Sequence, residues 1–238
     1  MRIALLGYGK MGKAIEEIAL SKGHTVVLKI DEHNQDDFTS ENISKADAAI
    51  EFTGPHSAFE NIKKAIGFGI PVVSGSTGWT ERIQEIRDYC TEQNGAFLYS
   101  SNFSIGVNIF FEVNKKLAAL MAPHPEYAIG LEEIHHTQKK DAPSGTAISL
   151  AEQILEKIER KKEWVNEESG DPASLPIISK RIDPAPGTHI IRYSSPIDDI
   201  EIIHTAHNRT GFASGAVLAA EFLKDKKGIY SMKEVLGL

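Results

Sequence analysis

Residues 3–12 read IALLGYGKMG, an apolar run that leads directly into a Gly-x-Gly-x-x-Gly turn. The run predicts a buried strand, and the pattern that follows it predicts a helix over residues 13–22. In such a turn Gly7 permits the tight bend, Gly9 lets a pyrophosphate approach the backbone, and Gly12 lets helix and strand pack closely. We therefore predict that free N–H groups at the start of this helix bind a dinucleotide.

A carboxylate at the end of the second predicted strand strengthens this interpretation. Residues 25–30 predict that strand, and Asp31 follows it, 19 residues after the last glycine of the turn. An acidic side chain there can accept hydrogen bonds from the ribose hydroxyls of an adenosine. Asp31 and Glu32 also place two negative charges where a 2′-phosphate would lie, so we expect NADH to be preferred. NADPH is the second candidate, because Lys10 and Lys13 are close in sequence.

Two further polar segments follow predicted strands of the same sheet. Residues 48–52 and 71–74 are short apolar runs, and residues 58–67 between them predict a helix. Taken alone, each segment that follows a strand could be a simple turn. Ligands bind at the carboxyl ends of the strands in parallel sheets, so we expect these segments to contact the nicotinamide half of the cofactor. The segments are residues 51–55 and 75–78, and their site candidates are Phe52, Thr53, Gly75, Ser76 and Thr77.

The pattern changes beyond about residue 104. Residues 127–136 and 188–207 read as longer strands with partial alternation, which suits an open sheet that is covered on one face. Between them, residues 144–158 predict a helix with a single buried apolar stripe. Residues 166–186 are rich in proline, glycine, serine and charge, which predicts a flexible connection.

The predicted fold class is therefore α/β with two domains. Residues 1–104 are expected to form a Rossmann-like dinucleotide-binding domain. Residues 214–224 return to a helical pattern that should pack on this domain, so residues 210–238 are assigned to it as well. Residues 105–209 are expected to form the second domain.

Composition excludes several classes of protein. A net charge of -7 at pH 7 argues against nucleic-acid binding, and the basic run at residues 160–162 is expected to be the solvated end of a helix. Cys90 is the only cysteine, which excludes an internal disulfide and fits a reducing compartment. No apolar window is long enough for a signal peptide or a membrane span. A cytoplasmic protein that does not bind membranes is the expectation.

A segment dense in titratable side chains lies between a predicted strand and a predicted helix. Residues 132–146 read EEIHHTQKKDAPSGT. On a strand His135 and His136 point to opposite faces, so one should face a cleft while the other is structural. Histidine suits a general acid, Lys139 suits a proton donor or carboxylate partner, and an anion could bind the amides of Ser144, Gly145 and Thr146. On these residues alone, a loop with a good helix N-cap remains the alternative.

The same segment resembles the signature of the dihydrodipicolinate reductase family, the 4-hydroxy-tetrahydrodipicolinate reductases: Glu-x-His-His, then Lys, then Asp-x-Pro-Ser-Gly-Thr-Ala. Motifs along nearly the whole chain support the resemblance. They are Gly9-Lys10-Met11-Gly12, Phe52-Thr53, Gly75-Ser76-Thr77-Gly78, Asn102-Phe103-Ser104, Ser179-x-Arg181, Gly187-x-His189, His204-x-Ala206 and Arg209.

The resemblance implies a specific reaction. It is the NAD(P)H-dependent reduction of 4-hydroxy-tetrahydrodipicolinate, through the dehydrated conjugated imine, to tetrahydrodipicolinate in lysine and diaminopimelate biosynthesis. The resemblance also implies an α+β substrate domain with an open mixed sheet, a homotetramer built through that sheet, and hinge closure of the domains.

Site residues carry over from the resemblance position by position. His135 would be the general acid with Lys139 as its partner at the imine, and the dicarboxylate substrate would contact His136, Ser144, Gly145 and Thr146. The cofactor would contact Gly7, Gly9, Lys10, Met11, Gly12, Asp31, Phe52, Thr53, Gly75, Ser76, Thr77, Ser101, Asn102, Phe103 and Arg209.

Other interpretations were weighed. A different NAD-dependent dehydrogenase on the same scaffold, acting on an amino acid such as aspartate, would need the same glycine turn. A non-catalytic NADH sensor would need the turn but have no use for His135 with Lys139. The pair His204 and His207 lies on a predicted strand and points to opposite faces, so no metal is expected. Ser144 follows no strand, which argues against a nucleophile elbow.

Overall fold

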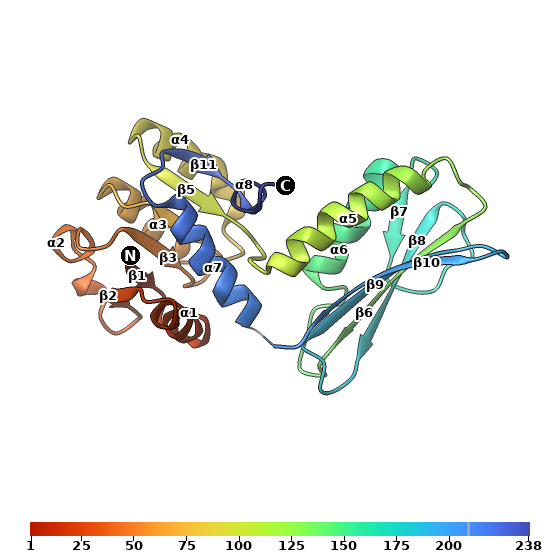
Figure 1. The fold of residues 1–238 in the computed structure, drawn as a ribbon, viewed down its shortest axis with the longest axis horizontal. Helices are drawn as coiled ribbons and strands as arrows, with labels where there is room; N and C mark the ends of the chain where they lie inside the picture. The colour runs from red at the N-terminus through yellow and green to blue at the C-terminus, as the bar shows by residue number, and fades with distance from the viewer. Residues whose placement is uncertain (209) are drawn as a thin grey trace. The chain divides into compact units, whose positions relative to one another are not determined.

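The computed structural model describes residues 1–208 and 210–238, and these form two compact units. Unit 1 comprises Met1–Asn108 and Thr210–Leu238, and unit 2 comprises Ile109–Arg209. Each unit has its own sheet and its own core (Figure 1). The helix α5 (Ile105–Met121) begins in the first unit and ends in the second.

Unit 1 is built on a six-stranded parallel sheet. Its order is β11-β5-β4-β3-β1-β2. The chain passes from β1 to β2 on one side and then to β3 on the other side of β1, so the direction of winding switches beside β1. Ligands of open α/β sheets bind at such a switch. The strands are β1 (Arg2–Leu6), β2 (Thr25–Ile30), β3 (Ala48–Glu51), β4 (Val72–Ser74), β5 (Ala96–Tyr99) and β11 (Gly228–Tyr230).

Helices cover both faces of this sheet, as Figure 1 shows. Leu6, Val72 and Phe97 pack in one core cluster with residues of α3 and α4, while Ile3 and Leu98 pack in the other with residues of α1 and α7. Strands that are buried on both faces read as continuous apolar runs, which is why the sequence predicted them well. The helices are α1 (Lys10–Ser21), α2 (Ser40–Ile43), α3 (Ala58–Gly67), α4 (Ile83–Glu92), α7 (Thr210–Leu223) and α8 (Met232–Leu236), with 3-10 turns at Gln35–Asp37 and Thr80–Arg82.

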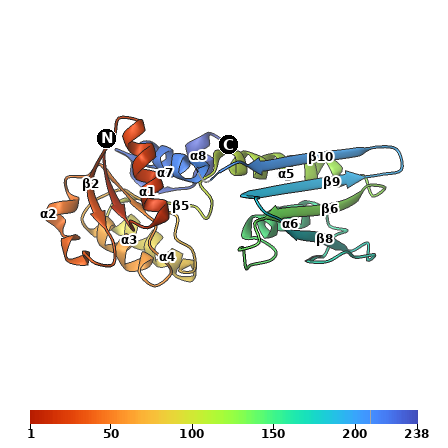
Figure 2. The ribbon, with the colours of Figure 1, turned by 90° about the horizontal axis from the view of Figure 1, so that it is seen from below.

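Unit 2 contains a five-stranded mixed sheet in the order β10-β9-β6-β8-β7. Figure 2 shows β10, β9, β6 and β8 side by side in this order. The pairs β10·β9 and β9·β6 are antiparallel, whereas β6·β8 and β8·β7 are parallel. One face packs against α5 and α6 through a core that includes Phe110, Leu150, Ile177 and Tyr193. The elements are β6 (Ala128–His135), α6 (Gly145–Lys157), β7 (Glu163–Val165), β8 (Ser174–Arg181), β9 (Gly187–Ser194) and β10 (Asp199–Ala206). The predicted α/β class, with a Rossmann-like sheet and a second open mixed sheet, is confirmed.

Two expectations for unit 2 were wrong. Residues 166–186 were expected to form a flexible connection, but they contain β8, whose Leu175 and Ile177 are fully buried. Pro176 made this strand hard to recognise in the sequence. In the structure the proline falls where the pairing changes: it is the last residue of β8 that pairs with β7, and it precedes the first residue that pairs with β6. Residues 188–207 form two antiparallel strands, β9 and β10, joined by a turn that begins at Ser195.

The basic run was also placed wrongly. Helix α6 ends at Lys157, so the run at residues 160–162 lies beyond it. Arg160 donates to the Ala122 carbonyl at 2.8 Å, and the Lys161 amine donates to the Ser174 carbonyl at 2.6 Å. These side chains therefore connect segments of unit 2 by hydrogen bonds, and they do not form the solvated last turn of a helix. Among the described residues, no helix has both the length and the apolar character needed to cross a bilayer.

Candidate active site

The glycine turn after β1 has the geometry that a dinucleotide requires. Gly7 has a φ of +97°, and a Cβ there would lie 2.2 Å from the Phe52 carbonyl oxygen. A Cβ at Gly12 would lie 2.2 Å from the Gly7 oxygen, so the helix and the turn are in direct contact. Gly9, in contrast, faces open space and precedes α1 without a side-chain cap. The first amides of α1 are therefore free of a cap and accessible, which fits a pyrophosphate.

Residues predicted to contact the adenosine and residues predicted to contact the nicotinamide half meet the turn in one cleft. A cavity of about 580 Å³ is lined by Gly7, Gly9, Asp31, Phe52 and Thr53, among other residues. Asp31 Oδ1 accepts a hydrogen bond from the His33 amide at 2.8 Å, which fixes the carboxylate beside the cleft. Its second oxygen has no hydrogen-bond partner among the described residues and suits a ribose hydroxyl. The structure thus brings five of the predicted cofactor residues together.

The remaining predicted cofactor residues have differing surroundings. Phe103 is 2% exposed and packs on Phe52, with ring centroids 5.7 Å apart, so it belongs to the core. Ser76 is also buried, and its hydroxyl donates to a carboxylate of β3. Lys10, Thr77 and Ser101 are exposed, while Met11, Gly75 and Asn102 are half-buried. Arg209 lies outside the described residues.

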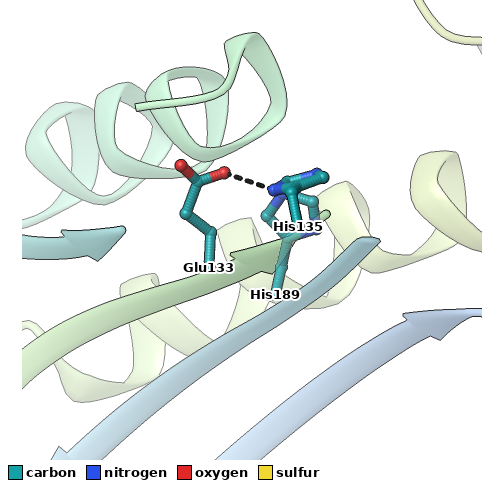
Figure 3. Close-up of side chains that lie close together, drawn as sticks. All are labelled: Glu133, His135 and His189. Carbon is teal, nitrogen blue, oxygen red and sulfur yellow. Dashed lines mark ion pairs between the residues drawn. The ribbon is translucent and has the colours of Figure 1, made fainter. Parts of the chain in front are cut away.

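In unit 2 the catalytic candidate His135 belongs to a buried polar cluster (Figure 3). Its Nδ1 lies 2.9 Å from Oε2 of Glu133, in an ion-pair contact. The His189 ring of β9 packs edge-on against the His135 ring, with centroids 5.2 Å apart. Glu133 is fully buried, and both histidines are less than a tenth exposed.

Strand geometry explains why these side chains meet. Residues two apart on a strand share a face, so Glu133 and His135 of β6 both point to the face covered by helices. The register between strands places His189 of β9 and Ser179 of β8 opposite Glu133 on either side. His136 follows the strand and is half-buried, in agreement with the expectation that the adjacent histidines differ in environment.

The other carboxylate oxygen of Glu133 collects three donors. Oε1 accepts from the Ser144 amide at 3.1 Å, the Ser179 hydroxyl at 2.8 Å and Arg181 Nη2 at 3.1 Å. Burial alone would raise the pKa of Glu133, but its contacts with His135, Ser144, Ser179 and Arg181 outweigh burial. The pKa therefore lies well below its usual range, and Glu133 is a fixed negative charge behind His135.

His189 is held as a neutral ring. Burial, and then the nearby His135, lower the pKa of His189 to about 4, although Glu133 acts in the opposite direction. Its Nε2 lies 3.2 Å from the Ser144 hydroxyl, which also accepts a hydrogen bond from the Ala147 amide at 3.2 Å. His189 therefore connects the histidine cluster to the N-cap of α6.

The loop between β6 and α6 is fastened to this cluster by Arg181. Its Nη2 donates to the Asp141 carbonyl at 2.6 Å, and its Nε donates to the Lys139 carbonyl at 3.3 Å. The Lys139 amine pairs with the Asp141 carboxylate at 2.7 Å, and in the described part of the chain it forms no hydrogen bond with His135. At the start of α6, the Ser144 amide is occupied by Glu133, so the amides available for an anion are those of Gly145 and Thr146.

Glu133, His135 and His189 also resemble a set of metal ligands. Each offers one ligand atom, and these atoms lie within 4.8 Å of one another. Arg181, however, already places a guanidinium against the same carboxylate. The donor set therefore fits an ion-pair and hydrogen-bond cluster better than a cation site.

Sequence reasoning gave no role to Glu133, Arg181 or His189. One signal was present: Glu133 lies two residues before His135, so the two side chains share a face. The partnerships of Arg181 and His189 arise from strand register, which the sequence does not encode in any local pattern.

Comparisons with known proteins identify the family of the chain. A family model described as dihydrodipicolinate reductase, N-terminus, matches residues 1–103, and one described as dihydrodipicolinate reductase, C-terminus, matches residues 106–236. The chain is 51% identical to a 4-hydroxy-tetrahydrodipicolinate reductase of Christiangramia forsetii, over 99% of this chain and 98% of that protein. It is 35% identical to the Methanosarcina acetivorans reductase of that name, over 99% and 89%.

Solved structures share the fold. A dihydrodipicolinate reductase from Paenisporosarcina sp. TG-14, solved with dipicolinate bound, has a TM-score of 0.77 at 24% identity and covers 97% of each chain. An amine dehydrogenase from Mycobacterium smegmatis has a TM-score of 0.61 at 10% identity, covering 97% of this chain and 94% of that one. With both family models matched along nearly its full length and a relative half identical to it, this chain belongs to the dihydrodipicolinate reductase family.

Proposed function

We propose that the chain reduces 4-hydroxy-tetrahydrodipicolinate to tetrahydrodipicolinate, with His135 as the general acid and NADH as the preferred hydride donor. Family membership makes it an NAD(P)H-dependent oxidoreductase of lysine and diaminopimelate biosynthesis. The observation that carries the role of His135 is its ion-pair contact with Glu133, at the base of the loop that leads into α6.

The two ring nitrogens of His135 have different surroundings. Nδ1 faces Glu133, while Nε2 lies beside Gly187, where an added Cβ would come within 3.1 Å of it. The missing side chain at Gly187 keeps Nε2 uncrowded, and the contact at Nδ1 orients the ring. We infer that Nε2 delivers the proton to the substrate ring after hydride transfer.

The start of α6 is the proposed site for the substrate carboxylates. Gly145 and Thr146 offer backbone amides, the helix end carries partial positive charge, and Lys139 adds a cation. The half-buried His136 is the proposed further contact. Bound substrate would compete with Asp141 for the Lys139 amine, which Asp141 holds at 2.7 Å.

The cofactor supplies the hydride, and the residues of unit 1 supply its position. The glycine turn would hold the pyrophosphate and Asp31 the adenosine ribose. Glu32 is 86% exposed beside Asp31, so two acidic groups would oppose a 2′-phosphate. This is the basis for the proposed preference for NADH, which the ratio of the Michaelis constants for NADH and NADPH measures directly.

Replacing His135 tests the proposal. Substrate is made in place by the preceding synthase, and NADH oxidation is followed by absorbance. His135→Gln should lower kcat by about 10²- to 10⁴-fold while the Kd for NADH stays unchanged. His124→Gln, on an exposed loop of the same unit, is the matched control and should behave as wild type. Retention of full activity by His135→Gln would remove His135 from the mechanism.

We also propose a cytoplasmic homotetramer built through the face of the unit 2 sheet that is turned away from α5 and α6. Two features of that face support the assembly. Ile203 of the edge strand β10 is 55% exposed, and a shallow groove is lined by residues that include Ile178, Ile190 and Arg192. Light scattering should give four times the chain mass. Ile203→Glu should reduce that mass, and a monomeric wild type would contradict the assembly.

A further inference from the structure

Glu51 is a second buried glutamate, and it lies in unit 1 where β3 ends. Its side chain is fully buried at the carboxyl edge of the sheet. Oε1 accepts from the Thr53 amide at 2.7 Å, the Thr53 hydroxyl at 2.5 Å and the Ser76 hydroxyl at 2.7 Å. Oε2 accepts from the Ser74 hydroxyl at 2.5 Å. Four donors converge on one group, which suits the ionised form because it only accepts hydrogen bonds.

The place of Glu51 in the sheet puts it under the expected nicotinamide half of the cofactor. Glu51 is paired in register with Leu6 of β1, which precedes the glycine turn, and with Ser74 of β4. It therefore lies beside the switch in winding, on the opposite side of β1 from Asp31 and the adenosine contacts. The residues it holds, Thr53 and Ser76, belong to the two segments expected to contact the nicotinamide.

The charge of Glu51 has no cationic partner among residues 1–208 and 210–238. Its four donors are all neutral, and the described ion pairs do not include it. A buried charge without a counter-ion is costly. A glutamine at position 51 could accept the same hydrogen bonds at Oε1. Its side-chain amide could donate to the Ser74 hydroxyl once that hydroxyl had rotated. Hydrogen bonding alone therefore does not explain why a carboxylate occupies this position.

We propose that Glu51 supplies a fixed negative charge that favours the positively charged, oxidised nicotinamide ring over the neutral, reduced ring, and so promotes hydride release. This inference rests on the proposed function, because it requires the nicotinamide to bind at this edge. A charge built into the protein in this way stabilises the charge that develops as the hydride leaves. The field of Glu51 reaches neighbouring groups: after burial, it is the second cause that raises the pKa of Tyr99.

Separate binding titrations of the two redox forms test the proposal. NADH is titrated by its fluorescence, and NAD⁺ by competition against it. For Glu51→Gln the Kd of NAD⁺ should rise about tenfold more than the Kd of NADH, as expected for losing a unit charge at short range in a partly buried site. Glu51→Met is a second neutral variant and should give the same shift. Glu51→Asp keeps the charge and should leave the ratio of the two Kd values within about twofold of wild type.

The outcomes separate this inference from the proposed function. Wild type that binds neither dinucleotide would contradict the proposed function itself. If wild type binds both, the inference is overturned when the neutral variants weaken the two forms equally, or when Glu51→Asp shifts the ratio as far as Glu51→Gln. If neither neutral variant folds, Glu51 is a requirement of the fold, and the inference is overturned as well. Asp31→Asn is the control on the adenosine side and should weaken both forms alike.

Discussion

Two glutamates are fully buried among the described residues, and they differ in what surrounds their charge. Glu133 in unit 2 contacts Arg181 and His135, as well as a hydroxyl and an amide. Glu51 in unit 1 accepts hydrogen bonds from three hydroxyls and one amide of the described chain. Both lie near the carboxyl end of a strand that leads into a predicted ligand loop. The same side chain thus occupies two electrostatic environments.

This difference indicates two uses of a buried carboxylate. At Glu133 the guanidinium of Arg181 balances the charge, so the carboxylate can fix the orientation of His135 and tie the loop before α6 to the sheet. At Glu51 the charge is hydrogen-bonded but unbalanced, so it remains available to a positively charged ligand. A balanced charge is part of the protein's own scaffold, whereas an unbalanced one acts on whatever binds beside it.

The largest test of this contrast is removal of each carboxylate. Glu133→Ala leaves the half-buried Arg181 without its carboxylate partner and strips three donors of their acceptor in the interior, so it should lower the free energy of unfolding by about 3–5 kcal/mol. Glu51→Ala leaves only neutral donors unpaired, so it should cost about 1–3 kcal/mol. Urea denaturation at a fixed protein concentration measures both values.

Glu132→Ala is the matched control for the first variant. Glu132 is adjacent to Glu133 on β6, but its side chain points to the other face and forms a part-exposed pair with Lys180 at 2.8 Å. Such pairs contribute about 0–1 kcal/mol. Equal losses for Glu132→Ala and Glu133→Ala, or a larger loss for Glu51→Ala than for Glu133→Ala, would contradict the contrast.

The pH dependence of stability should come from the cluster in unit 2. Burial first, and then His135, lower the pKa of His189 to about 4, below the 6.5 of an unperturbed histidine. The unfolded chain then binds a proton that the native state refuses, so stability is full above about pH 6.5 and falls as the pH drops towards about 4. Between about pH 7.5 and pH 5 the loss due to His189 should be about 2 kcal/mol.

Comparison with His189→Asn measures this contribution. The variant lacks the titrating group, so its unfolding free energy should fall less than that of wild type over the same pH range. His204 on β10 also has a pKa lowered by burial, and it should account for part of the remaining slope. Identical slopes for wild type and His189→Asn would show that the native state protonates His189 without penalty.

Much of unit 1 could be predicted from the sequence, although α4, β5 and β11 were not. The expected strand at residues 25–30 and helix at residues 58–67 coincide with β2 and α3, because apolar strand runs and amphipathic helices have strong local patterns. Unit 2 was harder. β8 contains a proline and follows a polar segment, and α5 spreads its apolar residues around more than one face, with Ile109 and Val113 exposed.

The site residues that the sequence could predict are also those with a local signal, and the residues it missed depend on long-range contacts. His135 and Ser144 lie in one short segment with a recognisable signature, so sequence reasoning could name them. Glu51 lay in a segment expected to contact the nicotinamide but was given no role of its own, because its partners Ser74 and Ser76 lie 23 and 25 residues further along the chain. Such partnerships depend on strand order and register, which a single sequence does not state.

The smallest expected effect concerns single hydroxyl donors to the two carboxylates. Within the described chain, Ser74 is the one donor to Oε2 of Glu51, whereas Ser179 is one of three donors to Oε1 of Glu133. Ser74→Ala should therefore cost about 1–2 kcal/mol of unfolding free energy, and Ser179→Ala under about 1 kcal/mol. The loss of one donor matters most at Glu51, because its charge has no cation beside it. We also expect added salt to restore little of the stability that Ser74→Ala loses. If urea denaturation gave the reverse order, the hydroxyls around Glu51 would not be what holds its charge in the interior.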